Sequence, residues 1–476
     1  MLVLQVIEYK TLKIKSIMEK FDIIVIGAGP GGYVAAIRAA QHGKRVAIVE
    51  KADAGGVCLN WGCIPTKALV RSAEVFANCK AAATYGVQID GEVKPDWTKM
   101  VERERMVATT MNKGVQFLLK KNNIEVIAGF GRLKSAHVVE VEGVEYETEN
   151  IILATGARPR VMPFMPIDGK HIISSKEALV LPELPETMVV VGSGAIGSEF
   201  AYIYATMGVK VTIVEYMPQI MPLEDEDTAK AMERAFRKMR AQVMTSTTVK
   251  QVTVREDGKC EVVVEGKKGE QTLEADVVLS AVGIKSNIED MGLEELGIEI
   301  ERDKIKVDEH YKTSVDGVYA IGDIIATPAL AHVASAEAIH CVEHICGLEP
   351  EAIDYSIIPS CIFTSPEVAS VGMTEAQVKA QGIEYKVGKF PYTASGKATA
   401  AGERDGFVKL IFDADEKLLG AHLVGHNVTE MIGEPTLAKT LGVTAHRIAH
   451  TIHAHPSMHE AVMEAAEDAL GCAIHM

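Results

Sequence analysis

Unbroken apolar runs that end at glycine clusters are the strongest pattern in the first half of the chain. Residues 21–27 are apolar apart from Asp22 and rich in β-branched side chains, so they predict a parallel strand buried on both faces. The glycine cluster that follows opens an alanine-rich helix, which we expect to reach Ala40, and residues 45–50 predict a second strand. A strand, a glycine turn, a helix and a strand in this order form the first unit of a dinucleotide-binding fold.

The same unit recurs in residues 188–215, with a second glycine loop, a helix to about Met207 and a final strand. Each unit ends in a glutamate at the same distance from its first glycine, since 50 − 27 = 23 and 215 − 192 = 23. One glycine motif of this kind is a weak signal, but two copies in the same context indicate two dinucleotide sites rather than two chance turns. The glycines are Gly27, Gly29 and Gly32 in the first loop, and Gly192, Gly194 and Gly197 in the second.

Both loops have the chemistry that a pyrophosphate needs. Glycines let backbone amides approach a phosphate closely, and the N-terminus of the following helix carries about half a positive charge. Glu50 and Glu215 can each accept hydrogen bonds from ribose hydroxyls. Glu215 would repel a 2′-phosphate, and residues 216–221 include no Arg or Lys to bind one. The second loop therefore favours NAD over NADP.

The remaining patterns are shorter. Residues 279–283 predict a strand that ends in a glycine turn, and residues 318–323 predict another strand with Asp323 at its carboxyl end. Ligands gather at such ends in open α/β sheets. From about residue 355, strands alternate with two predicted helices and no glycine fingerprint recurs, so we expect a separate α+β domain.

Composition restricts the class of protein. A chain of 476 residues has room for three or four domains. The net charge of −16 argues against a nucleic-acid or anionic-membrane partner, and no apolar run reaches the ~20 residues needed to cross a bilayer. Eight cysteines are too few for a disulfide-stapled secreted scaffold. Residues 1–17 lack the layout of a signal peptide, and we expect this extension to reflect an upstream start or to be a floppy arm.

Cys58 and Cys63 follow the first glycine loop and are five residues apart. Residues at this spacing in a regular helix have α-carbons roughly 8.6 Å apart, whereas a disulfide needs about 4.4–6.8 Å. A bridge would therefore require a distorted turn, which Gly62 and Pro65 help to form. With two nucleotide loops in the chain, the pair suggests a dithiol that exchanges electrons with a flavin and a nicotinamide. The alternative is a pair of buried structural cysteines.

Cys341 and Cys346 have the same spacing but lie in a segment that reads as an uninterrupted helix. We expect them to be buried helix residues that cannot bridge. Histidines gather near the C-terminus, and the first three have the spacing of a helix, with gaps of four and three. We expect no metal site there, because no cysteine or carboxylate set completes a tetrahedral shell. These histidines are His446, His450, His453, His455 and His459.

Together these motifs resemble the flavin-dependent pyridine nucleotide–disulfide oxidoreductases. The resemblance covers about residues 18–476 and rests on residues 55–67, 154–156, 192–199, 313–323 and 453–456. It implies an α/β fold with two Rossmann-like dinucleotide-binding domains and a C-terminal α+β dimerisation domain. The implied divisions are residues 1–17 as the N-terminal extension, 18–155 for FAD, 156–282 for NAD, 283–354 completing the FAD site, and 355–476 as the interface domain.

Within the family, the chain resembles the members that oxidise protein-bound dihydrolipoyl groups to lipoyl groups and reduce NAD⁺ to NADH. A substrate thiolate would attack Cys58, and Cys63 would pass electrons to FAD. His455 of the opposite subunit would act as the base, with Glu460 orienting its ring. The resemblance further implies a cytoplasmic homodimer, one non-covalent FAD per subunit and NAD⁺/NADH as co-substrate. Its partners would be lipoyl-bearing proteins of 2-oxo acid dehydrogenase or glycine cleavage systems.

The resemblance also assigns cofactor contacts. Glu50 would bind the adenosine ribose of FAD, Asp323 its ribityl and pyrophosphate region, and Gly131 would meet the adenine end. Lys67 would lie near the reactive flavin nitrogen and pair with Glu199. The other candidate contacts are Lys51, Thr155, Gly156, Ala157, Ala329, Leu330, Ala331 and His332 for FAD, and Ile196, Val249 and Gly283 for NAD. Residues 283–287 depart from the basic run that many family members carry there.

Two other functions are compatible with parts of the pattern. The first is a sibling reductase that uses NADPH to reduce glutathione disulfide or a similar small disulfide, and Glu215 argues against it. The second is a non-catalytic flavoprotein that serves as a docking subunit. The complete set of Cys58, Cys63, His455 and Glu460 argues against that role alone.

Overall fold

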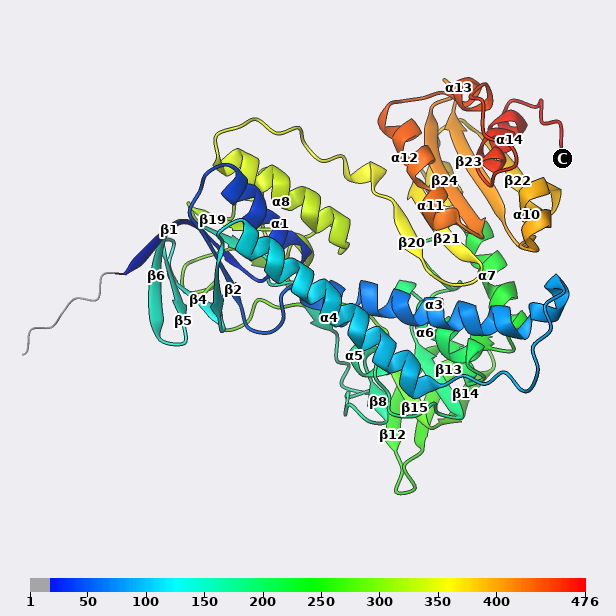
Figure 1. Ribbon diagram of the computed structural model, residues 1–476, viewed down its shortest axis with the longest axis horizontal. Coiled ribbons are helices and arrows are strands. Elements are labelled where there is room, and N and C mark those ends of the chain that lie inside the picture. The colour runs from blue at the N-terminus through cyan, green and yellow to red at the C-terminus, as the bar shows by residue number, and fades with distance from the viewer. Residues whose placement is uncertain (1–17) are drawn as a thin grey trace, which may run out of the picture.

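The computed structural model describes residues 18–476, and the predicted N-terminal extension lies outside them. Three main sheets organise the described part of the chain, two of them largely parallel and one antiparallel (Figure 1). This arrangement confirms the α/β fold with two nucleotide-type domains and a C-terminal α+β domain. No helix of residues 18–476 is long and apolar enough to cross a membrane.

The first sheet is built on the apolar run after residue 18. Its strand order is β3-β2-β1-β6-β5-β4, and β19 pairs with residues 151–153 of β6, beyond the stretch that pairs with β5. The pairs among β1, β2, β3, β6 and β19 are parallel, and β4–β5 and β5–β6 are antiparallel. Ile23, Ile24 and Val25 of β1 are fully buried, as a central strand requires. The strands are β1 (Glu19–Ile26), β2 (Val46–Glu50), β3 (Glu125–Ala128), β4 (Gly131–Ser135), β5 (Val138–Val141), β6 (Val144–Leu153) and β19 (Val318–Ala320).

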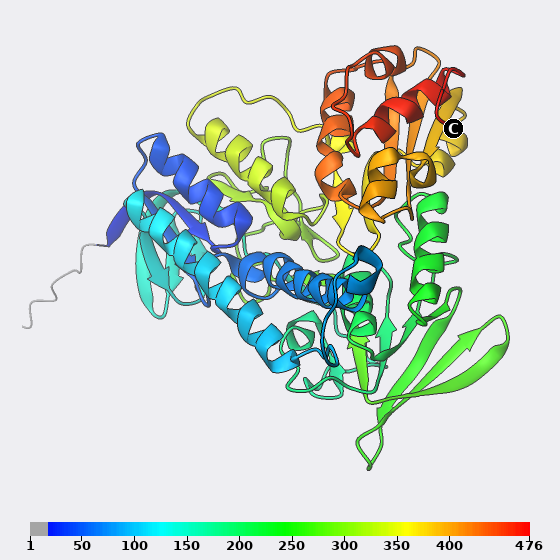
Figure 2. The same cartoon turned by 45° about the vertical axis from the view of Figure 1, so that its right-hand side comes forward.

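Helices surround this first sheet. α1 (Pro30–Gln41) packs beside α8 (Ala331–Ile345), which follows β19 much later in the chain. α2 (Gly56–Asn60) and α3 (Cys63–Lys80) carry the first cysteine pair. α3 packs against the long α4 (Trp97–Lys121), as both views show (Figures 1 and 2).

The second sheet repeats the nucleotide-binding unit with five parallel strands in the order β11-β10-β9-β15-β8. An antiparallel sheet of three strands, β12-β13-β14, extends from it, and short pairs join β7 with β16 and β17 with β18. The strands are β7 (Ala157–Pro159), β8 (Ile172–Ile173), β9 (Thr187–Val191), β10 (Lys210–Val214), β11 (Gln242–Met244), β12 (Thr248–Val254), β13 (Cys260–Gly266), β14 (Gly269–Ala275), β15 (Val277–Ser280), β16 (Ile284–Ser286), β17 (Ile300–Glu301) and β18 (Lys304–Ile305). Its helices are α5 (Ser175–Ala178), α6 (Ala195–Thr206) and α7 (Glu226–Lys238).

The C-terminal domain is an antiparallel sheet in the order β20-β21-β24-β23-β22. Its strands are β20 (Ser360–Ile362), β21 (Glu367–Gly372), β22 (Tyr385–Pro391), β23 (Phe407–Asp413) and β24 (Leu418–Gly425). Within residues 355–476 the structure describes six α-helices, so the expectation of two was too low. They are α9 (Glu375–Ala380), α10 (Gly396–Ala401), α11 (Val428–Met431), α12 (Gly433–Thr440), α13 (Ala445–Ala449) and α14 (Glu460–Ala469).

Candidate active site

The first cysteine pair lies on two helices rather than one. α2 ends at Asn60 and α3 begins at Cys63, with the backbone of Gly62 at φ −140° and ψ −116° between them. The helix is therefore interrupted between the two cysteines, as a disulfide at this spacing requires. Cys58 is half-buried and Cys63 is exposed, and both are free thiols, which argues against two buried structural cysteines.

The two thiols have opposite acidities. The hydrogen bond with Cys63, together with burial, raises the pKa of Cys58 far above that of a free thiol. The same hydrogen bond lowers the pKa of Cys63 to about 7, and the nearby ammonium of Lys67 lowers it further against the effect of burial. Thiolates, not thiols, are nucleophiles and electron donors. Above about pH 7 the reduced pair thus holds one proton on Cys58 and a thiolate at Cys63.

Lys67 joins this dithiol to the second nucleotide unit. Its Nζ donates to both carboxylate oxygens of Glu199 on α6, at 2.8 and 2.9 Å. Glu199 is 4% exposed, and burial raises its pKa while Lys67 lowers it. The backbone amide of Phe363 also donates to Glu199 at 3.0 Å, and Lys67 lies 4.5 Å from the centre of the Phe363 ring. The pairing of Lys67 with Glu199 is as expected.

Cys341 and Cys346 contrast with this site. Cys341 lies within α8 and is fully buried, and Cys346 caps the helix directly after Ile345. Cys341 is thus a buried helix residue as expected, whereas Cys346 is only half-buried and lies just past the end of the helix. Burial raises the pKa of Cys341 well above that of a free thiol, so it is inert.

The first glycine loop is a tight turn in which a Cβ would collide with the backbone. Gly27 has φ +102°, and a Cβ there would lie 2.3 Å from the carbonyl oxygen of Ala154. A Cβ on Gly32 would lie 1.8 Å from the carbonyl oxygen of Gly27. The Glu50 carboxylate accepts hydrogen bonds from the amides of Ala28 at 2.7 Å and Ala52 at 2.8 Å. Glu50 therefore sits beside the loop, at the carboxyl end of β2.

A cleft of about 420 Å³ opens beside this loop. Its lining includes Gly27, Glu50, Lys51, Gly131 and Thr155, which the family resemblance assigned to FAD. A small Gly131 matters here, because a Cβ would come within 3.4 Å of the side chains of Ile26 and Val49. The cleft has the residues that an adenosine needs, so the site fits FAD.

Residues 283–287, which depart from the family pattern, pair with the segment that follows β6. Thr155 donates to the carbonyl oxygen of Asn287 at 2.6 Å, and the Asn287 side-chain amide donates back to the Thr155 carbonyl at 3.0 Å. The amide of Asn287 also donates to the Gly156 carbonyl at 2.9 Å, and Ser286 pairs with Ala157 across β16 and β7. This run thus braces the FAD-side cleft.

Asp323 lies in a short turn at residues 322–324, after β19. Burial raises the pKa of its carboxyl group, and Lys304 opposes that effect. The neighbouring candidates Ala329 and Leu330 precede α8, and Ala331 and His332 form its first turn. His332 is exposed, and its Nε2 lies 3.0 Å from the carbonyl oxygen of Pro359.

The second glycine loop repeats the first. Gly192 has φ +96°, and a Cβ on Gly197 would lie 2.0 Å from the Gly192 carbonyl oxygen. Glu215, which is 6% exposed, accepts hydrogen bonds from the Ser193 amide at 2.9 Å, the Ser193 hydroxyl at 2.7 Å and the Met217 amide at 2.8 Å. These contacts hold a carboxylate next to the loop. Gly194 caps α6, so it stands at the N-terminus of that helix.

The other candidate NAD contacts on the second unit differ in their exposure to solvent. Ile196 in the first turn of α6 is 43% exposed, whereas Val249 on β12 is buried. Gly283 has φ +104°, and its carbonyl oxygen accepts the Arg160 amide at 3.0 Å.

The C-terminal pair forms as expected. His455 Nδ1 lies 2.8 Å from Glu460 Oε1, and the Ser457 amide donates to Glu460 Oε2 at 2.8 Å. Burial opposes the charge on Glu460, yet the Ser457 and His455 contacts lower its pKa overall. The imidazole of His455 is 79% exposed. Both views place α13 and α14, the helices that flank His455 in the sequence, at the outer end of the C-terminal domain, on the side away from α3 (Figures 1 and 2).

The other C-terminal histidines have carboxylate or helix contacts of their own. His453 Nε2 and His459 Nδ1 each lie 2.7 Å from an oxygen of Glu434. α13 ends at Ala449, so the helical spacing of His446, His450 and His453 does not correspond to one continuous helix. Within residues 18–476, no group of three potential ligands has a geometry that could hold a metal ion.

Comparison with known proteins assigns nearly the whole chain to one family. Residues 21–338 match the model of the pyridine nucleotide-disulphide oxidoreductase family, and residues 358–466 match the dimerisation domain of that family. The chain belongs to this family.

Named relatives narrow the comparison. A dihydrolipoyl dehydrogenase of Chlorobaculum parvum is 48% identical over 458 residues, which cover 95% of this chain and 97% of the relative. A dihydrolipoyl dehydrogenase of Bacillus subtilis is 43% identical and covers 96% of this chain and 99% of its own. Among solved structures, LpdA from Mycobacterium tuberculosis has a TM-score of 0.86 at 28% identity, over 94% of this chain and 99% of its own.

Two residues that contact the candidate site residues, Phe363 and Asn287, carry no obvious mark in the sequence. Phe363 holds Glu199 and Lys67 from the C-terminal domain, and nothing near position 363 points to residues 67 or 199. Asn287 braces Thr155 in the same way. Ser193 was visible as a hydroxyl between two loop glycines, a position from which it reaches the terminal glutamate of the unit.

Proposed function

We propose that the protein is a dihydrolipoyl dehydrogenase, which oxidises protein-bound dihydrolipoyl groups and reduces NAD⁺. The asymmetric dithiol of Cys58 and Cys63 carries this proposal, because it lies between two nucleotide loops and is joined to the second by Lys67 and Glu199. The near full-length relatives of the same name support it.

The residues of the first unit would hold FAD without a covalent bond, one molecule to each subunit. Its loop amides would meet the pyrophosphate, Glu50 the adenosine ribose, and Asp323 the ribityl region. When bound, FAD accepts an electron pair from a dithiol and delivers a hydride to a nicotinamide. Lys67 supplies a fixed positive charge beside Cys63, where the electron pair leaves the protein.

The dithiol does its work by exchange. One substrate thiolate attacks Sγ of Cys58 in the Cys58–Cys63 disulfide, so an S–S bond to the substrate forms and the bond to Cys63 breaks. Cys63 leaves as a thiolate, which the positive charge of Lys67 stabilises. The second substrate thiol then attacks the mixed disulfide, the lipoyl ring closes, and Cys58 departs with a proton, as its raised pKa favours.

His455 is the base that takes the proton from the substrate thiol. Its Nδ1 faces Glu460, which fixes the ring and stabilises its charged form, so Nε2 is the atom that receives the proton. Because α13 and α14, which flank His455, lie on the side of the C-terminal domain away from α3 (Figures 1 and 2), the base comes from a second subunit. The protein is therefore a homodimer formed through residues 358–466, in line with the dimerisation domain.

NAD⁺ rather than NADP⁺ is the electron acceptor. The carboxylate of Glu215 is buried and fixed by Ser193 and Met217 beside the second loop, where it can accept a ribose hydroxyl. A 2′-phosphate would place a second negative charge against it, without a cation in residues 216–221 to offset the repulsion.

Steady-state assays test this function. The FAD-loaded protein should reduce NAD⁺ with dihydrolipoamide and should be inactive in NADPH oxidation with glutathione disulfide. A lipoylated domain of a 2-oxo acid dehydrogenase or glycine cleavage system should replace free dihydrolipoamide. Activity only with NADPH and glutathione disulfide would overturn the assignment.

A further inference from the structure

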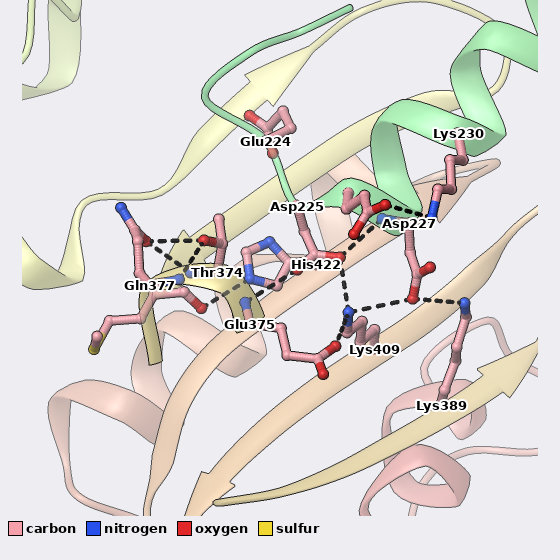
Figure 3. Close-up of polar contacts among 12 residues, drawn as sticks. Glu224, Asp225, Asp227, Lys230, Thr374, Glu375, Gln377, Lys389, Lys409 and His422 are labelled. Carbon is pink, nitrogen blue, oxygen red and sulfur yellow. Dashed lines mark hydrogen bonds and ion pairs between the residues drawn. The ribbon is translucent and has the colours of Figure 1, made fainter. Parts of the chain in front are cut away.

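A buried ionic cluster joins the second nucleotide unit to the C-terminal domain. Figure 3 shows Lys409 on β23 at its centre, with carboxylates approaching from the start of α7 and from α9. Its Nζ lies 2.8 Å from Asp225, 3.2 Å from Asp227 and 2.7 Å from Glu375. Lys409 is 2% exposed and Asp225 is 1% exposed. We call these four residues the junction cluster.

The cluster is strongly ionised despite its burial. Burial alone would lower the pKa of Lys409, but hydrogen bonds to Asp225 and Glu375 raise it well above its usual value. Burial opposes the charge on Asp225 too, and Lys409 nevertheless lowers its pKa. A lone buried charge is costly, whereas a fully paired group of charges is tolerated and favours a single geometry. Lys409 therefore constrains where Asp225 can lie.

Asp225 is the end of the segment that returns from the second glycine loop. It caps α7 by accepting the Asp227 amide at 3.0 Å. One residue earlier, the Glu224 amide donates to the Met221 carbonyl at 2.9 Å. Met221, buried and at φ +47°, in turn donates its amide to the carbonyl of Ser193 at 3.1 Å.

Ser193 closes the path, because it lies between Gly192 and Gly194 of the glycine loop. Its hydroxyl donates to Glu215 at 2.7 Å and accepts the Met221 amide at 3.2 Å. An unbroken series of hydrogen bonds and short covalent steps thus runs from Lys409 to the loop and the glutamate that the proposed function assigns to NAD⁺.

We propose that Lys409 is a positioning residue for the pyridine nucleotide site, acting through Asp225. This proposal rests on the proposed function, in which the second glycine loop binds NAD⁺. Lys409 holds Asp225, Asp225 fixes the turn at Met221, and that turn holds Ser193 and Glu215 in the geometry that binds the nucleotide. The C-terminal domain thereby helps to set the affinity of a site to which it contributes no loop.

Lys409→Met tests the proposal, with Lys389→Met as the matched control. Met keeps the length of the side chain and removes the charge. Lys389 lies on the next strand and pairs only with Asp227 of the cluster, at 2.9 Å, while its side chain is 40% exposed. We expect Lys409→Met to raise KM for NAD⁺ by about 5- to 150-fold, the usual span of coupling between sites. KM for dihydrolipoamide and kcat at saturating NAD⁺ should stay near wild type, and Lys389→Met should change neither KM.

A second variant guards against a folding defect. Asp225→Asn removes the charge but keeps a residue that caps helices well. Its Kd for NAD⁺, measured by titration of the FAD-loaded protein, should rise as in Lys409→Met, and the double variant should bind no worse than the weaker single variant. Variants with wild-type Kd, or with losses that simply multiply, would overturn the proposal. Wild-type protein that binds NAD⁺ but does not oxidise dihydrolipoamide would instead contradict the proposed function alone.

Discussion

Replacing Glu460 by Gln isolates the role of the C-terminal pair. Gln has the same shape and can still accept the Ser457 amide that Glu460 binds at 2.8 Å, so the start of α14 is kept. The carboxylate that faces His455 Nδ1 at 2.8 Å is lost, and the new amide group can donate to that nitrogen. The ring would then carry its proton on Nε2 and could no longer accept one there.

The size of the effect follows from the contact. A hydrogen bond to a charged group contributes about 1.5–3 kcal/mol, and 1.4 kcal/mol is about tenfold in rate. Loss of the pair should therefore lower kcat/KM for dihydrolipoamide by about 10- to 150-fold. The imidazole of His455 is 79% exposed, and water weakens such a contact. We therefore expect a loss of kcat/KM near the lower end of this range.

The assay needs two internal controls. Oxidation of NADH by an artificial acceptor that draws electrons from the flavin requires no substrate thiol, so Glu460→Gln should leave it unchanged. Glu464→Gln removes a similar carboxylate from the same helix, where it pairs with His475, and should keep full activity. Wild-type kcat/KM in Glu460→Gln, or equal losses in both variants, would refute the role given to His455 and Glu460.

Three further predictions follow from the dithiol and the first loop. Cys58→Ser should abolish dihydrolipoamide oxidation while the purified protein keeps its flavin, and normal turnover would count against the exchange mechanism. The thiolate of Cys63 is lost as the pH falls through about 7, so the rate of flavin reduction by dithiol should fall below that pH. Lys67→Met should move this fall by about 1–3 pH units to higher pH, and an unmoved profile would show that Lys67 does not lower the pKa of Cys63. Gly32→Ala should leave the protein without FAD, because its Cβ would lie 1.8 Å from a carbonyl oxygen, whereas Gly114→Ala in open space on α4 should keep full flavin content.

Short stretches of sequence predicted the features that depend on neighbouring residues, such as a buried strand or a break in a helix. The β-branched run of β1 is a central strand because both of its faces are buried. The break at Gly62 followed from the reach of a disulfide compared with the rise of a helix. The four shortest helices after residue 355 have six residues or fewer, which is too short to give a clear period in the sequence.

Contacts between distant segments could not be predicted in this way. The spacing of His446, His450 and His453 resembles a helix, but α13 ends at Ala449 and His453 turns towards Glu434 instead. Lys409 is one lysine among many in the sequence, and its ion pair with Asp225 forms only because two domains pack together. Such pairs become visible only once the chain is folded.

Reduction of NAD⁺ by dihydrolipoamide, followed side by side in wild-type and Cys58→Ser protein, tests the central claim most directly. The account predicts sustained NADH formation by the FAD-loaded wild-type protein and none by Cys58→Ser, with flavin still bound in both. NADH formation that survives the loss of Cys58, or a wild-type protein that turns over only NADPH with glutathione disulfide, would contradict it.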